Sequence, residues 1–172
     1  YPQQNALNSF RNGSWEGLSV DQIIRKRDQV SSWLLEQEFR KGDRIAIVPK
    51  IGSPEWMIVD FGCQQAGLVV VPIHPTSTPE EAEFILKETM CRLCITNDIL
   101  FYDKVNALRN AVPSLTAAYH LESGAAGYLP PLDSAYDRIT MEAVQKSRDA
   151  IAPSDILAIM YTSGTTGKPK GI

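Results

Sequence analysis

The sequence predicts an α/β fold in which a largely parallel sheet carries helices on both faces. Four short, mainly apolar runs begin at residues 44, 68, 92 and 116, at nearly even spacing. The first three show little polar–apolar alternation, which is typical of strands buried on both faces of a sheet. A segment with the apolar period of a helix follows each of these three runs. Because strands and helices alternate, we expect βαβ units with parallel strands and right-handed crossovers.

N-cap residues mark where the expected helices begin. They are Ser19, Ser53, Thr78 and Asp98. Gln22 and Glu81 stand three positions after the first and third of these and complete the spacing of a capping box. Pro54 suits the first turn of the helix after Ser53. The first helix is expected to run to about residue 38, with the charged run at 25–28 mostly on its solvent-exposed face.

We expect all 172 residues to belong to one domain with four successive segments. A short hairpin turns at the Asn12-Gly13 dipeptide. The βαβ units follow, then a surface excursion that contains a short helix, and last a buried strand over 156–161 that leads into a glycine-rich loop. The segments cover 1–18, 19–121, 122–153 and 154–172.

Composition and charge argue against several classes of protein. The net charge is −3 and no basic run is present, so attraction to nucleic acid has no electrostatic support. No apolar stretch reaches the roughly 18 residues of a membrane span. The hydrophobic and charged fractions, 44% and 22%, are ordinary for globular domains. We expect a cytoplasmic protein with at most peripheral contact at the inner face of a membrane.

Cys91 and Cys94 form a C-x-x-C pair, a spacing that zinc and redox sites also use. A zinc site would need two more ligands, and Cys63, His74 and His120 do not stand at ligand spacing. An odd separation along a strand also directs side chains to opposite faces. We therefore expect these cysteines to be small buried hydrophobic side chains in a reducing compartment.

Residues 161–172 have the clearest chemical character in the chain. Glycines at 164, 167 and 171 allow close approach of the backbone to a ligand, and successive N–H groups in such a loop form a cradle for anions. Hydroxyl and ammonium groups add donors and positive charge. They belong to Thr162, Ser163, Thr165, Thr166, Lys168 and Lys170. The segment is therefore predicted to bind a polyphosphate.

Two other interpretations of this segment are weaker. The P-loop of nucleoside triphosphatases is a poor match, because Gly164 and Gly167 are only three positions apart and Lys168 precedes Pro169. This mismatch disfavours a phosphotransferase. A flexible Gly/Thr linker is the other alternative, and the apolar run that leads directly into the segment argues against it.

Residues 161–171 resemble the phosphate-binding signature of the adenylate-forming superfamily, Tyr-Thr-Ser-Gly-Thr-Thr-Gly-x-Pro-Lys-Gly, at every position. Acyl-CoA synthetases, luciferases and the adenylation domains of peptide synthetases share this signature. Upstream segments match the family in order, namely Tyr1-Pro2 with Ala6-Leu7, 41–47, 53–56, 67–72 and Ser154-Asp155. The segments 53–56 and 71–78 are most similar to those of long-chain fatty acyl-CoA synthetases.

The resemblance implies part of the large N-terminal domain of an acyl-CoA synthetase-like fold, and a two-step ligase reaction. The substrates would be ATP, a long-chain fatty or other carboxylic acid and coenzyme A, with Mg2+ as cofactor. Carried over position by position, the residues that would hold the β- and γ-phosphates are Thr162, Ser163, Gly164, Thr165, Thr166, Gly167 and Lys168. Lys170 would be the catalytic residue that neutralises the departing pyrophosphate, and Thr162 would also help to place Mg2+.

Family enzymes run to several hundred residues, so we expect these 172 residues to be a fragment that cannot form acyl-adenylate alone. Two alternatives stay open for the parent: an adenylation domain that loads a carrier protein, and a non-catalytic structural fragment. Without a continuation to fix its far side, the segment 163–172 is expected not to keep one position.

Overall fold

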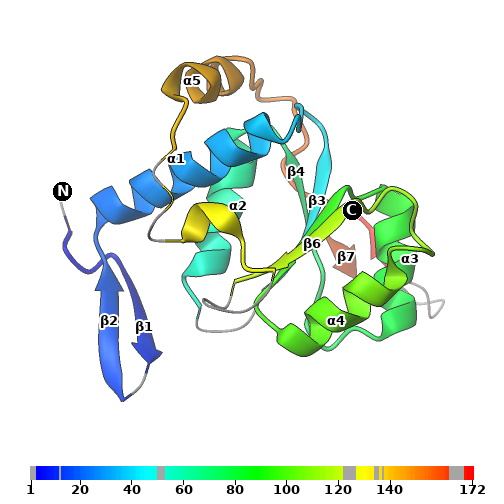
Figure 1. Ribbon diagram of the computed structural model, residues 1–172. Helices are drawn as coiled ribbons and strands as arrows, with labels where there is room; N and C mark the ends of the chain where they lie inside the picture. The colour runs from blue at the N-terminus through cyan, green and yellow to red at the C-terminus, as the bar shows by residue number, and fades with distance from the viewer. Residues whose placement is uncertain are drawn as a thin grey trace.

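Four strands form a parallel sheet in the order β4-β3-β5-β6, as the sequence predicts (Figure 1). The computed structural model describes residues 3–11, 13–49, 53–121, 127–133, 136, 138–162 and 169–172. The strands are β3 (Arg44–Val48), β4 (Val69–Pro72), β5 (Leu93–Thr96) and β6 (Ala117–His120). Because all three pairings are parallel, every strand ends at the same edge of the sheet.

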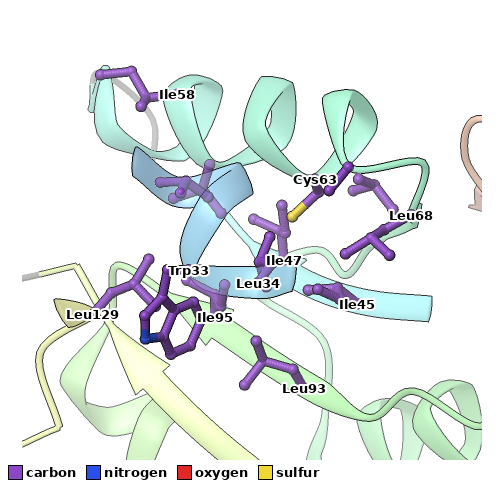
Figure 2. Close-up of a cluster of buried hydrophobic side chains, with 14 of the residues drawn as sticks. Trp33, Leu34, Ile45, Ile47, Ile58, Cys63, Leu68, Leu93, Ile95 and Leu129 are labelled. Atoms are coloured by element: carbon purple, nitrogen blue, oxygen red, sulfur yellow. The ribbon is translucent and has the colours of Figure 1, made fainter. Parts of the chain in front are cut away.

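Two pairs of helices cover the two faces of this sheet, one pair on each face (Figure 1). They are α1 (Val20–Glu36) with α2 (Glu55–Gln65), and α3 (Pro79–Thr89) with α4 (Ile99–Leu108). Side chains from α1 and α2 gather with Ile45 and Ile47 of β3 in one buried cluster (Figure 2). Ala46 and Val48 belong to the cluster under α3 and α4. The alternation along β3 therefore divides its side chains between two cores.

The predicted N-cap residues mark where these helices begin, with one exception. Thr78 Oγ1 accepts from the Glu81 N–H at 3.2 Å and Glu81 returns the contact at 2.9 Å, so the predicted capping box is confirmed. Ser19 and Gln22 form the same arrangement. Ser53 is not an N-cap as predicted: Pro54 occupies that position, and the Ser53 hydroxyl donates to the Glu55 carboxylate instead. The acid two residues away offers this hydroxyl a charged acceptor.

The charged run on α1 is not wholly solvent-exposed. Asp28 is only 7% exposed, because α1 packs along α2. Its carboxylate accepts from Gln65 Nε2 at 2.7 Å and from Arg27 Nη2 at 2.6 Å. The expectation of a solvated face is therefore wrong for Asp28, whose burial is compensated by an amide and a guanidinium.

The remaining elements lie around this core. The hairpin of β1 (Leu7–Arg11) and β2 (Ser14–Leu18) turns through Gly13, whose φ of 80° is in the left-handed region. A 3-10 turn, η1 (Pro130–Leu132), precedes α5 (Met141–Asp149). The chain before α5 is joined to α1 by a 2.7 Å hydrogen bond from the Thr140 N–H to Ser32 Oγ.

The buried strand expected over 156–161 is not formed as predicted. Only one parallel bridge, Val70 with Ala158, joins this stretch to β4. The exposed fractions of Ile156, Leu157 and Met160 are 65%, 58% and 59%. Two short strands follow instead, β7 (Tyr161–Thr162) and β8 (Lys170–Gly171). The apolar composition indicated a strand buried on both faces, but three of its large side chains are exposed and the stretch has one bridge to β4.

The three cysteines are free and buried, which confirms their expected place in the cores. Burial raises the pKa of Cys91 to about 11, and it also raises the pKa values of Cys63 and Cys94. Among the described residues, no group of three or more His, Cys, Asp or Glu side chains could hold a metal ion. Within the same residues, no helix is both long and apolar enough to cross a bilayer.

We expect all three thiols to resist modification in the folded protein, because the reactive thiolate is scarce and covered. A disulfide reagent at pH 8 should react only as fast as the protein unfolds, and all three thiols should react at once in guanidinium chloride. Rapid reaction of Cys91 or Cys94 in the native protein would contradict this and would reopen a redox role for the C-x-x-C pair.

Candidate functional site

The segment that leads to the predicted phosphate loop runs along β4 and in the same direction. The Val70 N–H donates to the Leu157 carbonyl at 3.1 Å, and the Ile159 N–H donates to the Val70 carbonyl at 2.9 Å. A chain parallel to β4 at this point continues toward the carboxyl edge of the sheet. In open α/β sheets this edge is where ligands bind.

A short antiparallel ladder then closes the loop. Tyr161 pairs with Gly171 and Thr162 pairs with Lys170. Met160 and Ile172 extend the ladder by exchanging backbone hydrogen bonds of 3.0 Å and 2.8 Å. The loop between the two strands therefore comprises residues 163–169, and both of its ends are fixed to one another.

The ladder brings two of the predicted site residues together. Thr162 and Lys170 are direct cross-strand partners and are both exposed. Side chains of such a pair project from the same face of the ladder. A hydroxyl and an ammonium group therefore stand side by side where the loop begins and ends, a combination that suits the oxygens of a phosphate.

The other predicted ligands of the phosphates cannot be placed in the same way. Ser163, Gly164, Thr165, Thr166, Gly167 and Lys168 lie outside the described residues. The sequence also predicted that the segment 163–172 keeps no fixed position, and the first six residues of that segment lie outside the described residues. Lys170 and Gly171 are described and pair with β7, while the mobility of the segment stays a prediction.

Tyr161 makes a contact that the sequence did not indicate. Its hydroxyl donates to the carboxylate of Glu88, in the last turn of α3. Burial of the ring, together with the hydrogen bond and negative charge of Glu88, raises the pKa of Tyr161 above its usual value. The two residues are 73 positions apart, so no local pattern could reveal the pair.

An ion pair fixes the start of the segment that leads to the loop. Asp155 accepts from the Ala152 N–H at 2.6 Å and from Lys41 Nζ at 2.6 Å. Lys41 Nζ also donates to the Ala150 carbonyl at 2.7 Å. An open hollow of about 340 Å³ lies beside this pair, between Gly42, Gly67 and Ile156. It adjoins the amino ends of β3 and β4, so it lies away from the edge that the loop approaches.

The two histidines take no part in this ladder. His74 is exposed, and its Nδ1 accepts from the Thr76 N–H at 3.2 Å within its own turn. His120 is fully buried in β6, with its ring 5.2 Å from that of Tyr102. Each histidine therefore has partners close to its own element.

Comparison with known proteins gives consistent results. A family model described as AMP-binding enzyme matches residues 1–172. Long-chain-fatty-acid–CoA ligase ACSBG1 of Bos taurus is 24% identical over 178 residues, which cover 100% of this chain and 24% of the relative. Long chain acyl-CoA synthetase 7, peroxisomal, of Arabidopsis thaliana is 28% identical over 176 residues, which cover 93% and 24%.

Solved structures share the fold. The crystal structure of the anthranilate CoA ligase AuaEII in complex with anthranoyl-AMP superposes with a TM-score of 0.72 at 24% identity, and the match covers 91% of this chain and 29% of that one. The parallel sheet and its helices are thus those of the corresponding part of an acyl-CoA ligase. The chain spans about a quarter of the length of the curated relatives that it matches.

The Ala152 N–H, and after it the Lys41 ammonium, holds the pKa of Asp155 below its usual range. The carboxylate therefore contributes all of its stabilisation above the pKa of an unfolded aspartate, about 3.9, and loses it as the pH falls through the lower folded pKa. An NMR titration of the carboxyl carbon should show this depressed pKa. In Lys41→Gln the pKa should rise but stay below the ordinary value, because the backbone donor remains. An ordinary pKa in the unmodified protein would disprove the interaction.

Proposed function

Because the chain belongs to the AMP-binding enzyme family, we propose that its protein activates a carboxylic acid with ATP and transfers the acyl group to coenzyme A. The names of the relatives support a long-chain fatty acid as the substrate. The enzyme would then be an acid–thiol ligase.

The proposed reaction has two steps. A carboxylate oxygen of the acid attacks the α-phosphorus of ATP, the bond to the bridging oxygen of the β-phosphate breaks, and pyrophosphate leaves. The thiol of coenzyme A then attacks the acyl carbon of the acyl-adenylate, loses its proton, and displaces AMP. The first step is needed because a carboxylate oxygen is a poor leaving group until it carries a phosphoryl group.

The residues at the loop take the following roles in this proposal. The segment from Thr162 to Lys168 holds the β- and γ-phosphates through backbone N–H groups and hydroxyls. Lys170 stabilises the negative charge that collects on pyrophosphate as it departs, and this makes it the catalytic residue. The observation that supports these roles most directly is the pairing of Thr162 with Lys170, since it sets a hydroxyl and a cation at the two ends of one loop.

Mg2+ fits this site only in part. The ion takes oxygen ligands, usually one or two carboxylates together with substrate phosphates. Thr162 offers one neutral oxygen, and among the described residues no group of three or more His, Cys, Asp or Glu side chains could hold the ion. Thr162 would thus supply a single ligand. The ion, when bound, would neutralise part of the negative charge on the phosphates of ATP.

Replacement of Lys170 by Met tests the proposal in the full-length natural protein. ATP–pyrophosphate exchange driven by a long-chain fatty acid should fall about 100-fold, the usual effect of losing one group that stabilises transition-state charge. The matched control is Lys104→Met, because Lys104 is an exposed lysine on α4 and belongs to neither strand of the ladder. Exchange at the normal rate in Lys170→Met would contradict the role of this lysine.

Two alternatives predict different products. An adenylation domain would transfer the acyl group to a carrier protein and leave free coenzyme A unreacted. A non-catalytic protein would show no exchange with any acid. Mass spectrometry of the thioester formed from a fatty acid, ATP and coenzyme A identifies the ligase, and the ATP–pyrophosphate exchange assay separates the other two.

We also expect the 172-residue chain, produced alone, to give no ATP–pyrophosphate exchange. It corresponds to about a quarter of the length of the ligases that it matches, so most of their substrate contacts would come from other residues. Exchange above the background of a Lys170→Met chain would show that this expectation is wrong.

A further inference from the structure

We propose that Glu88 of α3 is a positioning residue for the phosphate loop, and that it acts through the hydroxyl of Tyr161. This inference rests on the proposed function, because it assigns to Glu88 a part in placing Thr162 and Lys170 against ATP. Glu88 touches no substrate in this proposal, and its effect passes through the ladder of β7 and β8.

The ladder is too short to keep its own orientation. Two residue pairs form it, and one further pair of backbone hydrogen bonds extends it. An isolated two-stranded hairpin is marginally stable at best in water. Most of the ladder's residues are exposed. Tyr161, and Ile159 just before the ladder, pack against the core under α3. The direction of the loop therefore depends on how these two side chains are held.

The ring of Tyr161 lies against the backbone of the opposite strand. A Cβ atom on Gly171 would be 3.1 Å from Tyr161 Cζ, 3.3 Å from its hydroxyl oxygen and 3.3 Å from Ile159 Cγ2. These distances are shorter than ordinary van der Waals contacts, so a side chain at position 171 would have to displace the Tyr161 ring or Ile159 by a few tenths of an ångström. The ring is thus confined on one side by β8.

The hydroxyl at this end of the ring donates the hydrogen bond to Glu88. The close approach of Gly171 and the bond to Glu88 therefore both restrict the hydroxyl end of the ring, and through Tyr161 they restrict the backbone of β7. An acceptor that carries a full charge makes this bond stronger than one between neutral groups.

Glu88 can serve as an anchor because the last turn of α3 is itself fixed to the sheet. Arg44 of β3 donates through Nε to the Thr89 carbonyl at 2.7 Å and through Nη2 to the Met90 carbonyl at 3.3 Å. Ile85 and Leu86 of the same turn are buried against the sheet. A continuous series of contacts therefore runs from β3 through α3 and Glu88 to Tyr161, next to Thr162.

The test uses the full-length natural protein with Glu88→Ala, Glu88→Gln, Tyr161→Phe and the double variant Tyr161→Phe/Glu88→Ala. The control is Glu83→Ala, which removes the same charge from the same helix at a residue paired only with Lys87 among the contacts found. Two quantities are measured: the KM values for ATP and for the fatty acid, and the rate of tryptic cleavage after Lys170. Trypsin does not cut after Lys168, because Pro169 follows it.

Glu88→Ala and Tyr161→Phe should each raise the KM for ATP by about fivefold to tenfold, the equivalent of one hydrogen bond, and leave the KM for the acid unchanged. Glu88→Gln should stay within about twofold of the unmodified enzyme, since its amide oxygen still accepts. The double variant should be no worse than either single variant, because both remove the same bond. Cleavage after Lys170 should accelerate in parallel, with Glu83→Ala unchanged.

Several results would overturn the inference. An unchanged KM for ATP in Glu88→Ala, equal effects on both substrates, or a double variant whose effect is the product of the two single effects would each show that the pair does not position the loop. If the unmodified protein catalyses no exchange at all, the proposed function fails. The rate of cleavage after Lys170 in Glu88→Ala then decides the inference by itself.

Discussion

The burial of β3 on both of its faces is the constraint on which the rest of the structure depends. Ile45 and Ile47 face the helices α1 and α2, while Ala46 and Val48 face α3 and α4. A strand covered in this way needs helices on both faces of the sheet. The crossover helices α2, α3 and α4 supply them, α2 on one face and α3 and α4 on the other, and they carry the chain back so that all four strands run parallel. Parallel strands end at one edge, and the segment that joins β4 through Ala158 is directed to that edge as well.

Features of the fold that depend on neighbouring residues were predictable from the sequence. The capping box of Thr78 and Glu81 needs only three residues of local chain, and it forms as its spacing indicated. The misjudged features depend at least in part on partners far along the chain. Asp28 is buried because Gln65 lies opposite on α2, and Ser53 is drawn to Glu55 while it also accepts from Asn97 at 2.9 Å. The segment at 156–160 has the composition of an inner strand but the position of an edge.

The candidate site divides in the same way. The sequence predicted phosphate binding, because many hydroxyl-bearing residues, glycines and lysines lie between Thr162 and Lys170 and match a known signature. The pairing of Thr162 with Lys170 could not be predicted, since a linear motif does not reveal that its ends form a ladder. The contact of Glu88 on α3 with Tyr161 was even less predictable. From the sequence alone, a carboxylate in the last turn of a helix is expected to be solvated, and only the fold shows that a tyrosine hydroxyl lies next to it.

The single bridge between Val70 and Ala158 also has a consequence for the order of folding. Every strand pairing within the central sheet is complete once the chain has reached His120, whereas the ladder docks through contacts of much longer sequence separation. Closure of long loops is slow, and chains begin to fold from the N-terminus as they are synthesised. A nascent chain can therefore assemble the sheet with its helices first, and the ladder of β7 and β8 joins a scaffold whose strand pairings do not include it.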